Sequence, residues 1–567
     1  MVTFFRDIKE DLLTVTWRQT LFIVFCVFAI YGMLLFNPVT AYDFNSAKGD
    51  SFQVFLTYVF MHRISQAIVA GIFHDFTPSW TITVGLFLLF FTGVLLIVLF
   101  RRLGFSVAKS LLGVALWFST PFFFNRSIYQ HALPAETFAF CCDVLAMLSF
   151  ERIRRCRRFN RTLFIGAVLL CVISTSVYQA HLTLLLTGFM GITMLDWGKD
   201  CRTLIREWTF MAIIIGASVF VWFMVNHGPM LLVKIFGVVI PESGGAHDTI
   251  YWVTGGRSFL SNVKALFVGF VLNWVYNAFF VVGLRCVLLS FFFCLTLSLV
   301  CGIKREWNHS LSIIGFVFSV FVLPIIQCNF ANLRTFYCLI PLIVFTGMLI
   351  LKFSTRKSFV SLGVLIICTM GMAHETATLY YYNWKVKEHD KLHMSIVAHD
   401  LWGKYGLRIE RPVAIIGGWQ HYPTCWEDLR PFRQLPLINH PFTTYSNVTC
   451  VNVPREFYMV AREKVGLLIP MPDLQTYAVL RSDKELLSHP AYPKPGYIFE
   501  HHDLIVVNLG KYNSQWGTFR YGDYSSPNEK LLRHTLGMDK IDRFLIRISK
   551  YFRDLAERYP WTVTVDI

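Results

Sequence analysis

The sequence predicts a polytopic α-helical membrane protein of about eleven transmembrane helices, followed by a C-terminal domain of mixed α/β structure. The chain is 55% hydrophobic and only 16% charged, whereas soluble domains carry about a quarter charged residues. Its apolar residues are gathered in long runs. The net charge is +16, and the basic residues lie in short segments between these runs, as topology signals in membrane proteins do. A nucleic-acid partner is therefore not expected.

A transmembrane helix requires roughly 20 apolar residues, and eleven segments of the chain approach this length. They are Leu21–Phe36, Thr81–Phe100, Val107–Phe124, Leu133–Phe150, Leu163–Val177, His181–Leu195, Trp208–Val225, Phe279–Gly302, Leu311–Gln327, Thr335–Leu351 and Phe359–Met372. The apolar stretch from Lys264 to Gly302 is long enough for two spans. We expect one span preceded by a half-helix or in-plane helix, because two spans would reverse the orientation of all later segments.

The basic segments predict the orientation, because short cytoplasmic loops carry an excess of Lys and Arg. They are Arg101-Arg102, Glu151–Arg161, Lys199–Arg206, Lys304-Arg305 and Lys352–Lys357. The N-terminus is then cytoplasmic. The membrane domain covers residues 1–375, with external loops at 37–80 and 226–278, and residues 376–567 form an external domain. Within the first loop, Ser51–Phe73 is typical of a helix on the membrane surface.

The external domain is predicted to contain both strands and helices. Val413–Ile416 and Leu504–Val507 have the composition of buried strands. Tyr382–Lys404 and Asp539–Arg558 have the periodicity of amphipathic helices. This change in character after the last apolar run is the reason for dividing the chain into two domains.

Candidate catalytic carboxylates lie at the predicted external face, where polar groups in an apolar protein need a functional reason. Asp43 and Asp50 follow the first span, and Glu136 begins the fourth. Each could take a proton from an acceptor hydroxyl, and Asp43 is preferred. The alternatives are a solvated helix cap for Asp43 and a structural pair with Arg126 for Glu136.

Candidate substrate-binding residues lie at the same predicted face. Four arginines could hold a phosphate through their two-pronged guanidinium groups, and they are Arg63, Arg126, Arg257 and Arg334. His62, His131, Tyr178 and Gln179 complete the set. Arg63 and Arg334 could instead extend to lipid headgroups, and Tyr178-Gln179 could only shape a hairpin. No metal-ligand spacing is present, so neither a metal nor another cofactor is expected, although the Asp, Glu and His side chains could hold a divalent ion.

Short motifs in a particular order resemble the membrane glucosyltransferases of O-antigen modification, the bacterial and phage serotype-conversion Gtr type of the GT-C class. The motifs are Tyr42-Asp43-Phe44, Met61 to Ser65, Thr120 to Tyr129, Thr175 to Gln179, Arg334-Thr335, Asn383 with Asp390, Tyr492 to Gly496, and His502 to Val507. The family often has paired acidic residues after the first span, whereas here Asp43 stands alone and Asp50 comes later.

The resemblance implies a GT-C-like fold in the bacterial inner membrane with the C-terminal domain in the periplasm. It implies inverting transfer of a hexose, glucose in the family, from an undecaprenyl phosphate-linked donor to a lipid-linked O-antigen acceptor. An O-antigen polymerase would need similar external arginines, but it usually lacks so large an external domain. A transporter or flippase would more often have two related halves. A non-catalytic membrane scaffold is the remaining alternative.

Overall fold

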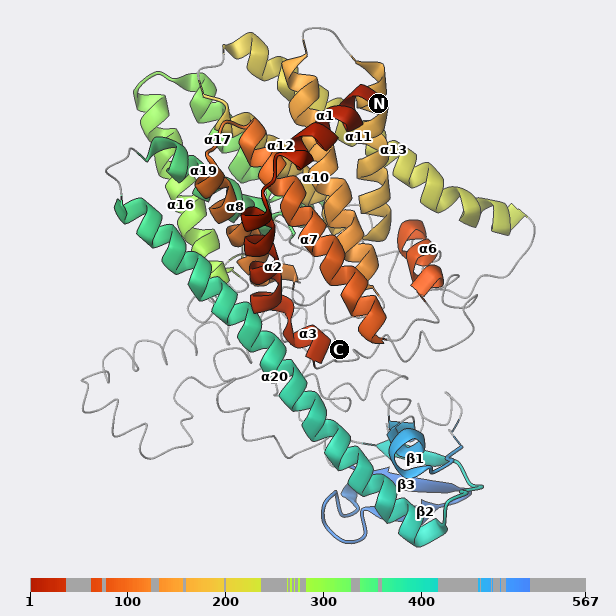
Figure 1. Cartoon of the computed structure of the whole chain (residues 1–567). Helices are drawn as coiled ribbons and strands as arrows, with labels where there is room; N and C mark the ends of the chain where they lie inside the picture. The colour runs from red at the N-terminus through yellow and green to blue at the C-terminus, as the bar shows by residue number, and fades with distance from the viewer. Residues whose placement is uncertain are drawn as a thin grey trace, which may run out of the picture. The chain divides into compact units, whose positions relative to one another are not determined.

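The computed structural model describes two compact units, and each is considered separately (Figure 1). The first unit extends to Tyr380 and the second begins at Tyr381. The described residues are 2–36, 63–73, 78–123, 132–156, 160–197, 200–235, 282–327, 337–354, 359–416, 457–470 without 459, and 486–509. Isolated positions at 263, 266, 267, 270, 274, 275, 472 and 480 are also described.

The first unit is built from helices. They are α1 (Val2–Leu13), α2 (Trp17–Tyr31), α3 (Met33–Phe36), α6 (Ile64–Phe73), α7 (Pro78–Arg102), α8 (Val107–Ser119), η1 (Pro121–Phe123), α10 (Leu133–Arg155), α11 (Arg161–Val177), α12 (Ala180–Leu195), α13 (Cys201–Ile235), α16 (Val282–Ile303), α17 (Trp307–Ser319), α18 (Val322–Gln327), α19 (Leu339–Phe353) and the first part of α20 (Phe359–Tyr405). In the described residues, five helices are long and apolar enough to cross a membrane. The protein is therefore a helical membrane protein.

The number of crossings stays a prediction, because several predicted spans coincide with shorter helices. The five long apolar segments are Ser79–Arg102, Leu133–Arg155, Cys201–Asn226, Val282–Ile303 and Phe359–Tyr381. Each of the other six predicted spans overlaps a helix of fewer than 18 residues. The apolar stretch before Gly302 forms one helix, α16, in its second part. The half-helix or in-plane helix predicted before α16 falls on residues 264–281, most of which lie outside the described residues.

Glycines let three helices of the first unit approach one another closely. A Cβ atom at Gly188 on α12 would lie 2.2 Å from Cε of Met147 on α10. A Cβ atom at Gly191, also on α12, would lie 2.5 Å from the ring of Phe345 on α19. A Cβ atom at Gly191 would clash with this ring, whereas the atom met at Gly188 is the end of a flexible Met side chain, which can shift. The two glycines therefore favour a close approach of α12 to α10 and α19.

One end of the first unit carries a layer of ion pairs, which we call the basic end. Arg154 on α10 lies 2.5 Å from Asp196 after α12 and 3.5 Å from Glu207 on α13. Arg102 at the end of α7 pairs with Asp11 on α1 at 2.5 Å. The predicted cytoplasmic segments around these residues therefore share one end of the unit.

Aromatic stacking brings two further helix ends to the basic end. Trp197, which follows α12, stacks on His309 of α17 with ring centroids 4.0 Å apart, and it contacts Phe353 of α19 at 4.7 Å. Lys304-Arg305 directly precedes α17, and Lys352 lies next to Phe353. All five predicted basic segments thus have described residues at or next to this end.

The second unit contains a three-stranded sheet in the order β1-β3-β2. β1 (Val413–Ile416) is parallel to β3 (Leu504–Asn508), which is antiparallel to β2 (Ile498–His501). The two strands predicted from the sequence are confirmed, and β2 was not predicted. Short helical turns lie at Ala461–Val465 and Leu486–Ser488. The sequence prediction for Asp539–Arg558 lies outside the described residues.

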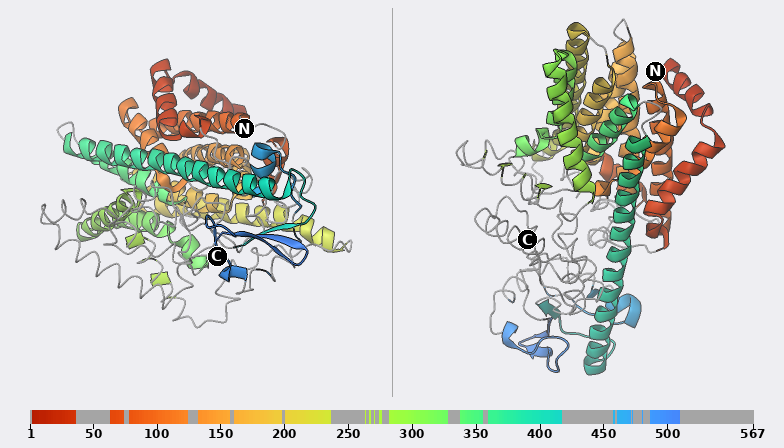
Figure 2. Two further views of the ribbon diagram at one scale, coloured as in Figure 1. Left: turned by 90° about the horizontal axis from the view of Figure 1, so that it is seen from below. Right: turned by 90° about the vertical axis from the view of Figure 1, so that its left-hand side faces the viewer.

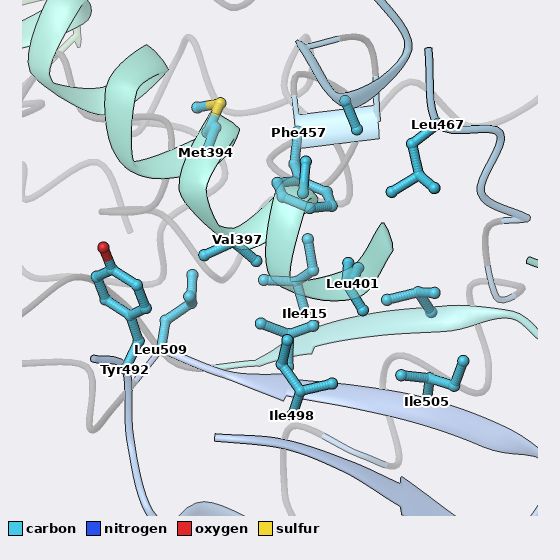
Figure 3. Packing of buried hydrophobic residues seen from close by; sticks show 14 of the residues in the cluster. Met394, Val397, Leu401, Ile415, Phe457, Leu467, Tyr492, Ile498, Ile505 and Leu509 are labelled. Carbon is cyan, nitrogen blue, oxygen red and sulfur yellow. The ribbon is translucent and has the colours of Figure 1, made fainter. Parts of the chain in front are cut away.

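The second unit has its main core between α20 and the sheet (Figure 3). Met394, Val397 and Leu401 of α20 pack against strand residues that include Ile415 and Ile505. The amphipathic helix predicted at Tyr382–Lys404 is therefore present, but it is not a separate element. It continues the last apolar span without a break, as one helix of 47 residues (Figure 2), because no Pro interrupts the helical pattern.

A tyrosine–aspartate hydrogen bond predicts how the second unit responds to alkali. The Tyr497 hydroxyl donates to Asp400 of α20 at 2.5 Å, and burial together with this carboxylate raises the pKa of Tyr497 above its ordinary value of 10.0. A raised pKa stabilises the fold below pH 10, and this contribution is lost as pH rises through the folded-state value. We expect the Tyr497→Phe variant to lose this alkaline dependence, measured by circular dichroism of the full chain between pH 8 and 12. Equal alkaline sensitivity in both proteins would contradict the assignment.

Candidate functional site

Four polar side chains meet inside the first unit, and we call them the buried cluster. Nδ1 of His181 lies 2.6 Å from Oδ2 of Asp143, and Nε2 lies 3.2 Å from Oε2 of Glu136. The Tyr337 hydroxyl donates to the same Glu136 oxygen at 3.2 Å. All four residues are fully buried. An imidazole thus bridges two carboxylates, one of which also binds a phenol.

The local structure explains why these side chains meet. Glu136 and Asp143 are seven residues apart on α10, which places them on one face of the helix two turns apart. His181 lies in the first turn of α12, and Tyr337 comes just before α19. Side chains of Phe140 and Tyr337 pack against the His181 ring at centroid distances of 5.2 and 5.0 Å. Apolar and aromatic groups therefore surround the polar contacts.

The cost of burying this cluster indicates a function. An ionised carboxylate inside an apolar bundle is very unfavourable unless it is paired and hydrogen-bonded. Ionisable residues within membrane helices accordingly tend to mark substrate paths, proton relays or ligand sites. An apolar core of equal shape would avoid the cost. The buried cluster is therefore the strongest candidate for a functional site among the described residues.

A cation lies beside the buried cluster. The Arg63 guanidinium stands 4.9 Å from the ring centre of Tyr178, and Tyr178 contacts Tyr337 with centroids 5.9 Å apart. Tyr337 in turn binds Glu136. The two tyrosines thus connect the arginine to the carboxylate.

The helix that follows Arg63 is anchored by hydrogen bonds. The backbone N–H of Ile64 at the start of α6 donates to Oδ1 of Asn226 on α13, at 3.2 Å. The Asn226 amide nitrogen donates to the hydroxyl of Ser176 on α11 at 3.1 Å. This chain fixes the start of α6 next to the α11–α12 turn, which contains Tyr178. Arg63 is therefore positioned by the bundle itself.

The buried cluster and Arg63 lie at the end of the first unit opposite the basic end. Glu136 is in the first turn of α10, whereas Arg154 is in its last turn. His181 is likewise in the first turn of α12, and Asp196, which pairs with Arg154, follows its last. The predicted site residues Glu136, Arg63 and Tyr178 are thus brought together at one end.

The remaining predicted site residues fall into two groups. Gln179 is the residue before α12 and is half-buried in the α11–α12 turn. Asp43, Asp50, His62, Arg126, His131, Arg257 and Arg334 all lie outside the described residues. Their predicted roles, and the predicted pairing of Glu136 with Arg126, stay predictions. His181 and Tyr337 both lie within hydrogen-bond distance of Glu136.

Asp143, His181 and Tyr337 are not among the site residues predicted from the sequence. For Asp143 a signal was available, since a second acid seven residues after Glu136 falls on the same helix face. One ring nitrogen of His181 faces Asp143 and the other faces Glu136. Tyr337 carried no such signal, because an aromatic residue near the start of an apolar helix is common in membrane proteins.

Within the described residues no three His, Cys, Asp or Glu side chains are placed to hold a metal ion. Comparisons of the chain with protein-family models, with curated proteins and with solved structures found no match.

Proposed function

We propose that this chain is a membrane glycosyltransferase that moves a hexose from an undecaprenyl phosphate-linked donor to a lipid-linked O-antigen. The reaction takes place at the end of the membrane unit that carries the buried cluster. This end faces the periplasm of a bacterial inner membrane, because the basic end is cytoplasmic by the positive-inside rule. The sugar is glucose and the fold is of the GT-C class, as the resemblance to O-antigen glucosyltransferases implies.

The observation that supports the proposal is that a carboxylate, Glu136, and an arginine, Arg63, lie at one end of the unit. They are linked by successive contacts through Tyr337 and Tyr178. Inverting transfer needs a base to take the proton of the acceptor hydroxyl. It also needs a cation to stabilise the phosphate that leaves. Among the described residues, Glu136 fits the first role and Arg63 the second. Asp43 remains the alternative base.

A second function, proton-coupled transport of a lipid-linked sugar, is favoured by one observation. The Glu136–His181–Asp143 chain is fully buried and extends two helical turns into the unit, as proton relays in pumps and transporters do. A polymerase has no comparable support from the described residues. The two leading functions differ in their products, because only transfer changes the covalent structure of the acceptor.

The experiment that tests the proposal uses the purified full chain in liposomes. The donor is a radiolabelled undecaprenyl phosphate hexose and the acceptor is a lipid-linked O-antigen repeat. We expect the label to appear on the acceptor as a single added hexose, identified by mass spectrometry. Label that crosses the bilayer unchanged would replace the proposal by transport, and joined acceptor repeats would replace it by polymerisation.

Substitution of Arg63 by Lys is expected to lower kcat/KM about tenfold, because a lysine keeps the charge but loses the planar fork and its face-on contact with Tyr178. A charged hydrogen bond is worth about 1.5–3 kcal/mol, which corresponds to this factor or more. The matched control is Arg18→Lys, since Arg18 lies over the Trp17 ring at 5.6 Å but at the other end of the unit. Equal kinetics for both variants would remove Arg63 from the donor site.

A further inference from the structure

We propose that His181, held by Asp143, carries the positive charge that keeps Glu136 ionised inside the apolar bundle. This inference rests on the proposed function in one respect, that Glu136 acts as a base. It assigns His181 and Asp143 as positioning residues, which act on the reaction only through Glu136.

With Asp143 and Glu136 both ionised, the hydrogen-bond geometry requires a doubly protonated imidazole. An ionised carboxylate accepts hydrogen bonds and cannot donate them, so a ring nitrogen facing one must carry the proton. Nδ1 faces Asp143 at 2.6 Å and Nε2 faces Glu136 at 3.2 Å. With both nitrogens protonated, His181 donates to both carboxylates at once.

The charge balance explains why a histidine stands at this position. Two ionised carboxylates alone would give the cluster a charge of −2 in an environment of low dielectric, at a large cost. An imidazolium between them reduces this to −1, and the Tyr337 hydroxyl stabilises the Glu136 oxygen further. A neutral residue at position 181 would remove the imidazolium from Glu136, which favours the protonated carboxyl, and a protonated Glu136 could not accept another proton.

The groups around His181 come from three helices. Glu136, Phe140 and Asp143 belong to α10, Tyr337 precedes α19, and Ser174 of α11 faces Asp143. The two carboxylates of α10 face the imidazole, one at each ring nitrogen. The state of Glu136 therefore depends on His181 directly, and on Asp143 through it.

The reaction step balances with these groups. The O–H bond of the acceptor breaks and its proton goes to Glu136, while the hydroxyl oxygen forms a bond to C1 of the hexose. The C1–O bond to phosphate breaks, and its electron pair leaves with undecaprenyl phosphate. Glu136 becomes neutral, and the cluster charge changes from −1 to 0. His181 keeps both protons throughout.

The direct test is infrared spectroscopy of the purified full chain, which needs no substrate. We expect the His181→Gln variant to show a new C=O band of a protonated carboxylic acid at pH 7. The band should disappear in the His181→Gln, Glu136→Gln double variant. His309→Gln is the matched control, because His309 lies at the basic end, and it should show no new band.

A second variant keeps the test valid if His181→Gln does not fold, which size-exclusion chromatography would reveal. Asp143→Asn keeps an oxygen acceptor for Nδ1–H but removes the negative charge, so it should shift the shared proton from His181 to Glu136 and produce the same band. The inference is overturned if neither variant shows the band, or if the wild type already shows a band that Glu136→Gln removes.

The pH dependence of hexose transfer tests this inference separately from the proposed function. In the liposome assay, His181→Gln should raise the pH of half-maximal transfer by about one unit or more, which is a tenfold change in proton affinity. An unchanged pH profile would reject the role of His181 although the chain is a transferase. If the wild type transfers no hexose, the proposed function fails, and the infrared result still decides whether His181 keeps Glu136 ionised.

Discussion

Substitution of Glu136 by Gln is expected to lower the rate of hexose transfer about 10²–10⁴-fold, the usual contribution of a general base. Gln has nearly the same shape and can still accept the hydrogen bond of Tyr337 and pair with His181, so the cluster should remain assembled. What it cannot do is take a proton. The loss should therefore fall on kcat, with little change in KM, as measured in the liposome assay at saturating donor.

The control for this result is Glu306→Gln. Glu306 lies at the basic end, where its side chain is 43% exposed and faces His309 at 3.3 Å. The same chemical change there should leave transfer within twofold of wild type, since surface ion pairs contribute only about 0–1 kcal/mol. Full transfer by Glu136→Gln would assign the base to another carboxylate, with Asp43 first.

Removal of the Arg154 charge is expected to destabilise the protein by about 3–5 kcal/mol, the usual cost of leaving buried charges without their partner. Arg154 is 3% exposed and faces Glu151 and Glu207, each 2% exposed, at 3.8 and 3.5 Å. In Arg154→Met, Glu207 would stay buried and lose this cation, whereas Glu151 would keep its ion pair with Arg155. The measurement is the midpoint of thermal unfolding in detergent.

Two further variants test whether the loss of stability in Arg154→Met comes from the broken buried ion pair. Arg154→Met combined with Glu207→Gln should recover most of the stability, because the buried acid that faced the removed cation is neutralised as well. Arg6→Met is the surface control, since Arg6 and Glu10 pair at 3.9 Å with both side chains about two-thirds exposed. Its effect should stay under about 1 kcal/mol. A loss in Arg154→Met no larger than in Arg6→Met would show that the basic end contributes little to stability.

The fold class could be predicted from the sequence because lipid selects for a pattern that is visible locally. A helix in an apolar solvent must satisfy its own backbone groups and present apolar side chains, so an apolar run such as Thr81–Phe100 predicts a helix and its approximate ends. The helix observed there, α7, runs from Pro78 to Arg102. The strands around Val413 and Leu504 were predictable for a similar reason, since short apolar runs bounded by turns are typical of buried strands.

Some element boundaries were not predictable. The sequence pattern ends the last span near Met372, where polar residues begin, but α20 continues to Tyr405. Hydropathy reports the solvent around a helix, whereas the helix itself continues as long as each residue can adopt helical angles. β2 was not predictable because only its first two residues, Ile498 and Phe499, are apolar, and Glu500 and His501 follow them.

The sequence by itself determined that the protein is a helical membrane protein. It also identified Glu136, Arg63 and Tyr178 as candidate site residues, because polar side chains are costly in an apolar protein. Only the tertiary structure decided which side chains share a site. Asp143, His181 and Tyr337 join Glu136 where α12 packs against α10 and against the start of α19, and Gly188 and Gly191 favour this close packing. The physical reason is that hydropathy depends on each residue and its near neighbours, whereas the charge state of a buried carboxylate depends on side chains 45 and 201 residues away in the chain.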